Sequence, residues 1–354
     1  MKIMHIICGP GAGGAEVFVK DMSLEMSRRG HKIHVVFLQT AKESGRQEEF
    51  GLRFLKLLLD EGISYEFIGA KSRKNPLLGI ITLKRIIKRF NPDIVHSHLY
   101  WPLLFLIFIR GFPVIFTKHS IQFGAPKILL QILLTRVSAF VAICEACKKK
   151  FLTVAGTKIV QIDNGTSFKV KPEQVDVASP TVRLLYVGRL FAVKNIGLVL
   201  HACSELSDLE FELRIAGEGP QLLELQSLAA DLKVDHKVNF LGNIEDVSNE
   251  MLRTDIFLMS SLSEGLPISL IEASLSGLPC LVTDVGGCGE VIKRCQNGFV
   301  VPSGDLFSYS QKLRLMIEDG ALRETFSRNA KQRSQHYSID RAVTQHLNLY
   351  QTIL

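Results

Sequence analysis

Two glutamates in the second half of the chain, Glu264 and Glu272, are of a type and spacing suited to binding hydroxyl groups. The apolar run 256–259 predicts a buried strand, Glu264 lies in the Ser/Gly loop after it, and a helix is predicted to open near Pro267. Carboxylates at the end of a strand and beside a helix N-terminus mark the usual ligand crevice of an α/β sheet. Because carboxylates accept hydrogen bonds from hydroxyls, the expected ligand is a polyol such as ribose or a hexose. The alternative is a solvated loop residue and a partner for the helix dipole.

Two cations, Arg189 and Lys194, follow the predicted strand 182–187. Arg offers a planar fork to phosphate and Lys a point charge, so the pair is suited to stabilising a diphosphate. The alternative is two solvated loop cations. No acidic D-x-D pair stands at a plausible strand end, and we therefore expect a site that works without a metal ion.

A glycine-rich segment follows the first predicted strand. Gly9, Gly11 and Gly14 match G-x-G-x-x-G, the dinucleotide fingerprint. The acidic residue that should end the second strand is missing, because that strand ends in Gln39 and Thr40. We therefore disfavour NAD or FAD and expect a flexible turn whose N–H groups, at a helix N-terminus, face a negatively charged group.

Three histidines lie at predicted strand ends in the first half. His119 follows strand 114–117, and His96 and His98 flank the end of another strand. Alternation along a strand places His96 and His98 on one face. A histidine at a strand end is also often simply packed or solvated.

Composition and charge restrict the class of protein. The 354 residues suffice for two domains with ordinary apolar content. The N-terminus lacks a signal-peptide pattern, and the apolar run 99–109 is too short to span a bilayer. Cys144 and Cys147 form a C-x-x-C, for which a redox-active pair is the alternative, and we expect ordinary reduced thiols of a cytoplasmic protein.

The two halves differ in charge. Residues 1–165 hold 24 Lys+Arg and 12 Asp+Glu, whereas the remainder holds 18 and 23. Segment 77–90 combines apolar residues at helical spacing with paired basic residues, and 148–150 adds three lysines. Such helices lie on anionic membrane surfaces, and the alternative is a solvated basic face. No aromatic-interleaved basic stripe is present, and we expect no nucleic-acid partner.

Strands and helices alternate in both halves, which predicts parallel sheets. The predicted strands are 2–7, 32–38, 66–68, 94–96, 114–117, 139–143, 159–162, 182–187, 211–216, 238–241, 256–259, 280–283 and 298–300. The helices predicted in the first half include 15–29, 52–61, 77–90 and 128–136. Segment 167–180 breaks the rhythm and is the predicted linker.

Short motifs in order along most of the chain resemble the retaining GT-B glycosyltransferases of the glycosyltransferase 4 type (glycosyl transferases group 1). They are GGAE (13–16), DIVHSH (93–98), TKH (117–119), LYVGRLFAVKN (185–195), LRIAGEGP (213–220), VNFLG (238–242), DIFLMSSLSEGLPISLIEA (255–273), VTDVGG (282–287) and NGFVVPSGD (297–305). One departure is Asn195, where the family usually has Gly. Asn also adopts the left-handed backbone conformation that a turn glycine supplies.

The resemblance implies an α/β GT-B fold, with two Rossmann-like domains whose parallel sheets face each other across a cleft. The domains would be 1–166 on the acceptor side and 167–337 on the nucleotide-sugar side, with the last helix, about 338–354, packing back on the first domain. The implied activity moves a hexose or N-acetylhexosamine from a nucleotide diphosphate sugar, with UDP favoured, to a glycan or lipid-linked acceptor. The nucleotide sugar is a substrate, so no cofactor and no metal is expected.

The resemblance also implies roles for individual residues. Glu272 would bind the nucleotide ribose, Glu264 the sugar hydroxyls, and Arg189 with Lys194 the leaving diphosphate. His119 would hydrogen-bond the sugar or phosphate. Further donor-binding candidates are Gly13, Gly14, Gly265, Leu266 and Pro267, and the acceptor-side candidates are Glu16 and His98.

Bacterial surface-polysaccharide assembly, including that of lipopolysaccharide, is the implied setting. The expected location is the cytoplasm, with peripheral contact at the inner face of the plasma membrane. Two other functions stay open: a GT-B-fold UDP-sugar epimerase, and a non-catalytic sugar-nucleotide-binding protein. A sensor has no need to stabilise a leaving diphosphate, so the set of basic and acidic residues favours an enzyme.

Overall fold

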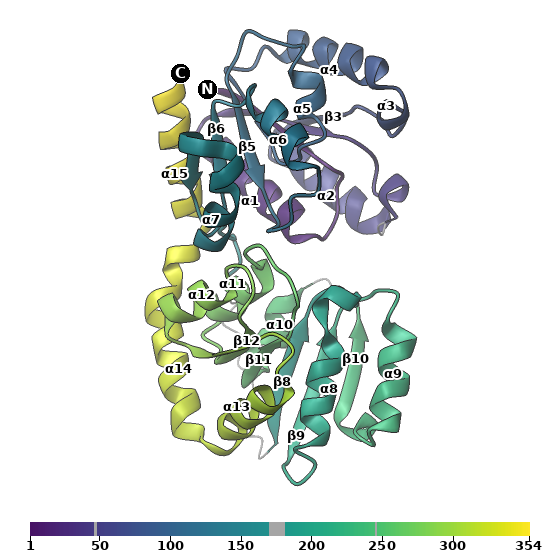
Figure 1. Cartoon of the computed structure of the whole chain (residues 1–354), viewed down its shortest axis with the longest axis vertical. Helices are drawn as coiled ribbons and strands as arrows, with labels where there is room; N and C mark the ends of the chain where they lie inside the picture. The colour runs from purple at the N-terminus through teal and green to yellow at the C-terminus, as the bar shows by residue number, and fades with distance from the viewer. Residues whose placement is uncertain (46–47, 170–180, 245) are drawn as a thin grey trace. The chain divides into compact units, whose positions relative to one another are not determined.

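The computed structural model describes residues 1–45, 48–169, 181–244 and 246–354. The chain divides into two compact units (Figure 1), a first unit of Met1–Ser167 with Ile339–Leu354 and a second unit of Phe168–Ser338. Most of the predicted linker, residues 170–180, lies outside the described residues. Each unit is a parallel sheet with helices packed on it, as the resemblance implies.

The first unit contains a seven-stranded sheet in the order β3-β2-β1-β4-β5-β6-β7, with every pairing parallel. The strands are β1 (Lys2–Ile7), β2 (Lys32–Phe37), β3 (Ser64–Phe67), β4 (Ile94–Ser97), β5 (Val114–Lys118), β6 (Ala139–Ala142) and β7 (Ile159–Gln161). The central strands are buried along nearly their whole length. Burial on both faces explains why they read as continuous apolar runs.

The helices of this unit follow the strands. They are α1 (Gly14–Arg28), α2 (Glu48–Asp60), α3 (Lys71–Lys74), α4 (Pro76–Phe90), α5 (Leu103–Leu106), α6 (Lys127–Leu134), α7 (Glu145–Ala155) and α15 (Ile339–Ile353), with short 3-10 turns η1 (Lys42–Ser44) and η2 (Gly156–Lys158). Local sequence sets the bounds of α4. Asn75 caps it by accepting a hydrogen bond from the N–H of Leu78, Pro76 opens it, and Asn91 ends it in the left-handed conformation.

The last helix, α15, packs on α1 of the same unit. Arg29 donates to the Asp340 carboxylate and to the Thr344 hydroxyl at 2.8 Å. Further along the helix, the buried Tyr350 hydroxyl lies 2.5 Å from Nδ1 of His96. The end of the chain therefore completes the core of its first half.

The second unit contains a six-stranded parallel sheet in the order β10-β9-β8-β11-β12-β13. Its strands are β8 (Val182–Val187), β9 (Phe211–Ala216), β10 (Val238–Gly242), β11 (Ile256–Met259), β12 (Cys280–Thr283) and β13 (Gly298–Val301). Its helices are α8 (Ile196–Ser204), α9 (Leu222–Asp231), α10 (Val247–Leu252), α11 (Ile268–Leu275), α12 (Cys288–Cys295), α13 (Leu306–Glu318) and α14 (Gly320–Arg333), with η3 (Ala192–Lys194), η4 (Asp235–Lys237) and η5 (Ser334–Tyr337).

Each sheet has one point at which the strand order reverses. It lies between β1 and β4 in the first unit and between β8 and β11 in the second. Loops at the carboxyl ends of two such strands diverge to opposite faces of the sheet, and this divergence opens the crevice that ligands use in α/β proteins. The topology thus directs attention to the loops after these four strands.

Most predicted elements exist with bounds shifted by a few residues. The helix predicted to open near Pro267 is α11, which begins at Ile268, and Pro267 is the extended residue before it, with φ −73° and ψ 125°. Proline fixes φ alone, and this φ fits either position, so ψ decides. All seven cysteines are free thiols, including Cys144 and Cys147. Within the described part of the chain, no helix combines the length and apolar character needed to cross a bilayer.

Replacing Tyr350 with Phe is expected to lower the free energy of unfolding of the first unit by about 1–3 kcal/mol, because Nδ1 of His96 loses its partner inside the core. Urea unfolding followed by circular dichroism measures the change. The matched control is Tyr65→Phe, on the partly exposed strand β3. Equal midpoints for Tyr350→Phe and wild type would contradict a contribution from this hydrogen bond.

Candidate active site

In the second unit, the loop after β8 carries the two predicted cations. Arg189 is exposed, and its guanidinium lies 5.0 Å from the centre of the Phe191 ring. Among the described residues it makes no side-chain hydrogen bond or ion pair. Lys194 ends the turn η3, and Asn195 follows with φ 49°, the left-handed conformation expected of it. Arg189 is therefore the cation of this loop that is available to a ligand.

Two glycines let the loop after β9 support the Arg189 loop. A Cβ at Gly217 would lie 1.9 Å from the Gly188 carbonyl oxygen, and one at Gly219 would lie 2.3 Å from that of Leu190. Side chains at these positions would collide with backbone, which cannot move away cheaply. The close approach explains why the LRIAGEGP motif carries glycine at both places.

The structure brings Lys194 and Glu264 together. The Lys194 ammonium forms an ion pair with Oε1 of Glu264, which also accepts a hydrogen bond of 2.6 Å from the Ser261 hydroxyl. Both charged side chains are mostly buried, at 19% and 10% exposed. The backbones of the two loops are joined as well, since the N–H of Leu262 donates to the Val193 carbonyl at 2.8 Å. Spacing alone gave no sign of this pairing.

The loop after β12 holds the backbone of the acidic loop. Gly286 has φ 56°, and a Cβ there would lie 2.3 Å from the Glu264 carbonyl oxygen and 2.6 Å from that of Gly265. The N–H of Gly287 donates to the Gly265 carbonyl at 2.7 Å. Gly286 and Gly287 therefore fix the backbone of the Glu264 loop.

The remaining predicted donor residues of this unit follow in order. Leu266 and Pro267 are buried, and Glu272 is partly buried in the second turn of α11. Glu264 thus lies in a loop and Glu272 in the helix after it, as the sequence indicates. Carboxylates and cations are gathered in the loops after β8 and β11, the strands of the reversal point.

In the first unit, the glycine-rich loop joins β1 to α1. A Cβ at Gly9 would lie 2.7 Å from the Gln39 carbonyl oxygen, so the loop runs against the end of the second strand. Gly13 is the residue before α1, Gly14 begins that helix, and Glu16 lies in its first turn with 6% of its surface exposed. Gln39, where a dinucleotide site needs a carboxylate, is buried.

A cluster of five histidines lies beside this loop. His5, His96, His98 and His119 belong to β1, β4 and the ends of β4 and β5, and His346 comes from α15. The His96 and His98 ring centres are 4.1 Å apart, on one face as predicted. His96 is held by Tyr350 and by the Thr117 hydroxyl, 2.7 Å from its Nε2. It is a structural residue of the core.

Burial lowers the pKa of every histidine in the cluster. The pKa values of His5 and His119 fall to about 3, and that of His346 to about 4, with desolvation as the largest cause in each. Neighbouring imidazoles and, for His119, the ammonium of Lys118 add to the effect. The pKa values of His96 and His98 also lie well below the usual range. At neutral pH these rings are uncharged.

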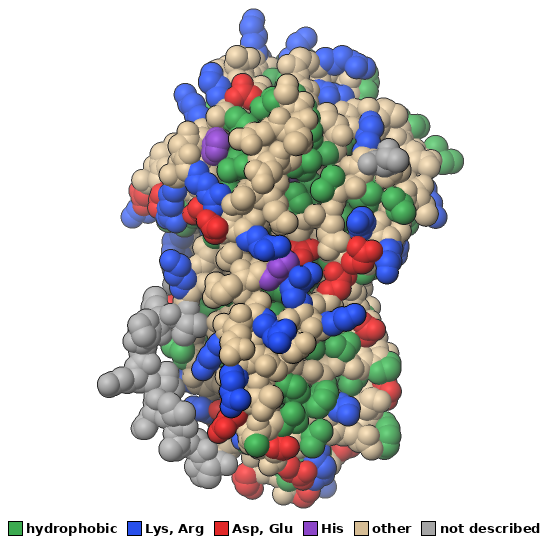
Figure 2. All heavy atoms as spheres, turned by 90° about the vertical axis from the view of Figure 1, so that its left-hand side faces the viewer, with side chains coloured by type: hydrophobic (Ala, Val, Ile, Leu, Met, Phe, Trp, Pro, Cys, Tyr) green, Lys and Arg blue, Asp and Glu red, His purple; other side chains and the backbone are tan. Residues whose placement is uncertain are grey.

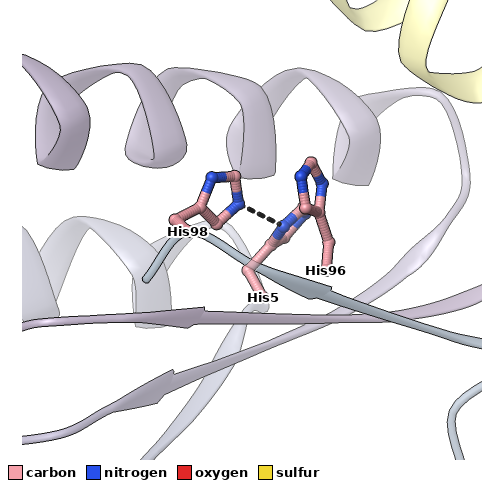
Figure 3. Close-up of side chains that lie close together, drawn as sticks. All are labelled: His5, His96 and His98. Atoms are coloured by element: carbon pink, nitrogen blue, oxygen red, sulfur yellow. Dashed lines mark hydrogen bonds between the residues drawn. The ribbon is translucent and has the colours of Figure 1, made fainter. Parts of the chain in front are cut away.

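Three of the rings could be taken for a metal site. One nitrogen from each of His5, His96 and His98 lies within 4.8 Å of the others (Figure 3). However, Nδ1 of His5 and Nε2 of His98 are joined by a hydrogen bond of 3.2 Å, and both nitrogens of His96 already have partners. The nitrogens that face one another are therefore hydrogen-bonded in this arrangement, and we describe the cluster as a hydrogen-bonded network.

Sequence reasoning missed His5 and His346. His5 is the one polar side chain in the apolar part of β1, and its register partner on β4 is His96. A histidine inside an otherwise apolar strand was the available signal. His346 gave none, because its place depends on how α15 packs.

Comparison with known proteins identifies the family. The model described as glycosyltransferase family 4 matches residues 12–169, and that described as glycosyl transferases group 1 matches 168–333. A Bacillus anthracis N-acetyl-alpha-D-glucosaminyl L-malate synthase is 21% identical over all of this chain and 98% of its own length. An Escherichia coli UDP-Gal:alpha-D-GlcNAc-diphosphoundecaprenol alpha-1,3-galactosyltransferase is 25% identical, covering 91% of this chain and 89% of its own.

A solved structure agrees at the level of the fold. Anabaena Alr3699/HepE in complex with UDP superposes with a TM-score of 0.83 and 20% identity, covering 99% of this chain and all of that one. The two parallel sheets, the order of the motifs and both family models lead to one conclusion. The chain belongs to the GT-B glycosyltransferases of the glycosyltransferase 4 type.

Proposed function

We propose that this glycosyltransferase is a retaining, metal-independent enzyme that moves a hexose or N-acetylhexosamine from a UDP-sugar to the hydroxyl of a glycan or lipid-linked acceptor. The observation that carries the proposal is that the loop after β8 holds an exposed Arg189 and also Lys194, which forms an ion pair with Glu264 from the loop after β11. It combines a group for the diphosphate with a carboxylate for hydroxyls. The setting we propose is bacterial surface-polysaccharide assembly.

The leaving group sets the chemical demand. When the bond from sugar to phosphate breaks, negative charge grows on the diphosphate, and fixed cations lower the energy of that state. Arg189 is exposed and supplies a planar fork of N–H donors. Lys194 supplies a second positive charge, held in place by Glu264. Two such cations remove the need for a metal ion in this role.

The carboxylates have separate tasks. Glu264 accepts hydrogen bonds from sugar hydroxyls with the lone pairs that Lys194 and Ser261 leave available, and so orients the reacting carbon. Glu272 accepts from the ribose. Further donor contacts come from Gly265 to Pro267 in the second unit and from Gly13 and Gly14 in the first.

The first unit supplies the remaining groups. His119 hydrogen-bonds the sugar or phosphate, and Glu16 serves the acceptor. His98, whose two ring nitrogens are bonded to His5 and His119, acts on the acceptor side through the His119 ring that it holds. No side chain is assigned as a covalent nucleophile. The leaving phosphate takes the acceptor's proton on the same face, and the anomeric configuration is retained.

The acceptor and the membrane are linked in this proposal. Apolar side chains Leu77, Leu78 and Ile81 of α4 are 41–71% exposed, and the basic residues Lys84 and Lys88 continue the same helical stripe. Helix α4 packs on α5 and α5 on α6, whose Ile128 and Ile132 are 73% and 53% exposed.

The apolar and basic residues of α4 therefore form one mixed face, here called the α4 face (Leu77, Leu78, Ile81, Lys84, Lys88). Lys and Arg with hydrophobic side chains between them are also prominent on the side of the first unit seen in Figure 2. A mixed apolar and basic surface fits an anionic bilayer. We propose that the α4 face holds the enzyme on the bilayer, beside a lipid-linked acceptor.

Replacing Arg189 with Ala is expected to lower kcat/KM for sugar transfer about 10- to 150-fold, because a charge-assisted contact to the diphosphate contributes about 1.5–3 kcal/mol. Transfer from radiolabelled UDP-sugars to an acceptor panel measures it, with Arg328→Ala on α14 as the matched control. Near-normal transfer in Arg189→Ala would remove this residue from its role. Sugar release as an epimer without acceptor would instead indicate an epimerase, and UDP-sugar binding without turnover a sensor.

Calorimetry of Glu272→Ala tests the nucleotide site. Wild type is expected to bind UDP in preference to GDP, ADP and NAD without added metal, and the variant to bind UDP about 10- to 150-fold more weakly, since the ribose loses a charged acceptor. Glu324→Ala, exposed on α14, is the control. Selective NAD binding would mean that the glycine-rich loop is a dinucleotide site after all.

Sedimentation with vesicles tests the α4 face. The chain is expected to bind vesicles with anionic lipid in a salt-sensitive manner, and Leu77→Glu with Ile81→Glu to weaken binding at least about tenfold, because burial of each side chain contributes about 1.5–3 kcal/mol. Leu223→Glu, 78% exposed on α9, is the matched control. An equal loss of vesicle binding in the Leu77→Glu/Ile81→Glu protein and in the Leu223→Glu control would refute the proposed surface. So would the absence of vesicle binding by wild type.

A further inference from the structure

Three histidines of the first unit form a hydrogen-bonded row. Nδ1 of His5 lies 3.2 Å from Nε2 of His98, and Nδ1 of His98 lies 3.0 Å from Nε2 of His119. The rings come from β1 and from the loops after β4 and β5, which are neighbours in the sheet. Figure 3 shows the first of these bonds. The row runs from the centre of the core to the predicted sugar or phosphate contact, His119.

Both ends of the row are unpaired. Nε2 of His5 and Nδ1 of His119 are buried and have no hydrogen-bond partner among the described residues. The two ends differ in their surroundings, because His5 is fully buried whereas His119 is partly exposed. A partner from outside the protein can approach the row only at the His119 end, where the ring is partly exposed although its Nδ1 atom is buried.

The number of protons follows from charge neutrality. Desolvation keeps all three rings uncharged at neutral pH, as shown by their lowered pKa values. A neutral imidazole carries one N–H, so the row holds three, and two of them are used in the two internal hydrogen bonds. The third must sit at one of the two unpaired ends.

The direction of the row follows from where that third N–H is tolerated. At Nε2 of His5 it would be a buried donor without a partner, which proteins avoid more strictly than an unpaired acceptor. Nδ1 of His119 is also buried, but it lies on the least buried ring of the row, which is the end that a ligand oxygen can approach. The favoured order therefore has Nδ1–H of His5 donating to His98 and Nδ1–H of His98 donating to His119.

We propose that His5 and His98 are positioning residues that hold His119 in the Nδ1–H tautomer, so that it presents a neutral N–H donor to an oxygen of the sugar or its phosphate. The use of this donor in transfer rests on the proposed function. The tautomer itself does not. A neutral N–H at His119 favours hydrogen-bonding to an oxygen of the donor substrate. It lacks the full positive charge with which an imidazolium would attract any anion.

The first experiment determines the tautomers directly. Full-length protein labelled with 15N-histidine is studied at pH 7.5 by long-range 1H–15N correlation, and metal content is measured on the same sample. The expected result is Nδ1–H at His5, His98 and His119, without stoichiometric metal. Nε2–H or imidazolium at His119 would overturn the proposal, and so would one tightly bound transition metal per chain.

Variants test the positioning role and keep it separate from the activity. His5→Phe removes the donor that starts the row and is expected to release His119 into a mixture of tautomers, with kcat falling about 10- to 100-fold and KM changing less. His5→Asn restores an N–H near the position of Nδ1. It is expected to recover most of the Nδ1–H tautomer at His119 and most of the lost kcat. His34→Phe, also buried in this unit but bonded to Ser64 on the neighbouring strand β3, is the matched control.

The outcomes are distinguishable. Unchanged His119 tautomer in a folded His5→Phe protein would overturn the positioning role. A shifted tautomer in a protein that transfers no sugar under any condition would leave the row standing and refute the proposed function instead.

Discussion

The Lys194–Glu264 ion pair is the interaction on which the second unit's site depends, because it joins loops from the two strands at which the sheet order reverses. Removing either partner would leave a mostly buried charge uncompensated, which costs far more than an exposed pair contributes. The pair is reinforced by Ser261 on the side chain and by Gly286 against the backbone of Glu264. Arg189 stands outside this framework, and within the described part of the chain its guanidinium lies over the Phe191 ring and makes no hydrogen bond or ion pair. The site thus combines fixed charges with one cation that is free to meet a ligand.

In the first unit, the histidine row is stabilised by hydrogen bonds between uncharged rings and not by an ion pair. The histidine cluster of this unit consists of uncharged rings, and burial is what keeps them uncharged. Neutral groups need only hydrogen bonds to be stable in a core, so no counter-charge is required. The two units use the same sheet topology but opposite electrostatics: paired ions in one and a neutral network in the other. The basic surface of the first unit lies apart from this network, on side chains that remain in solvent.

The sequence predicts the elements well because buried parallel strands read as apolar runs and glycines mark the turns between them. The places of Glu264 in the loop after β11 and of Glu272 in the following helix were predictable for the same reason. The pairing of Lys194 with Glu264 was not, since it joins positions seventy residues apart and depends on β8 lying next to β11. His5 escaped notice because a single histidine in an apolar strand is usually core, and its importance lies in partners on other strands.

The contribution of α15 shows most clearly why such a site cannot be predicted from local pattern. Tyr350 and His346 come from the far end of the chain, yet they fill the space around His96 and fix it on the β4 side of the sheet. His98 lies two residues further, and its ring centre is 4.1 Å from that of His96. Helix α15 carries no candidate site residue, yet it fixes the position of His96, and the His98 ring of the histidine row packs against His96. In physical terms, packing at the C-terminus sets the geometry of a polar network that three earlier strands supply.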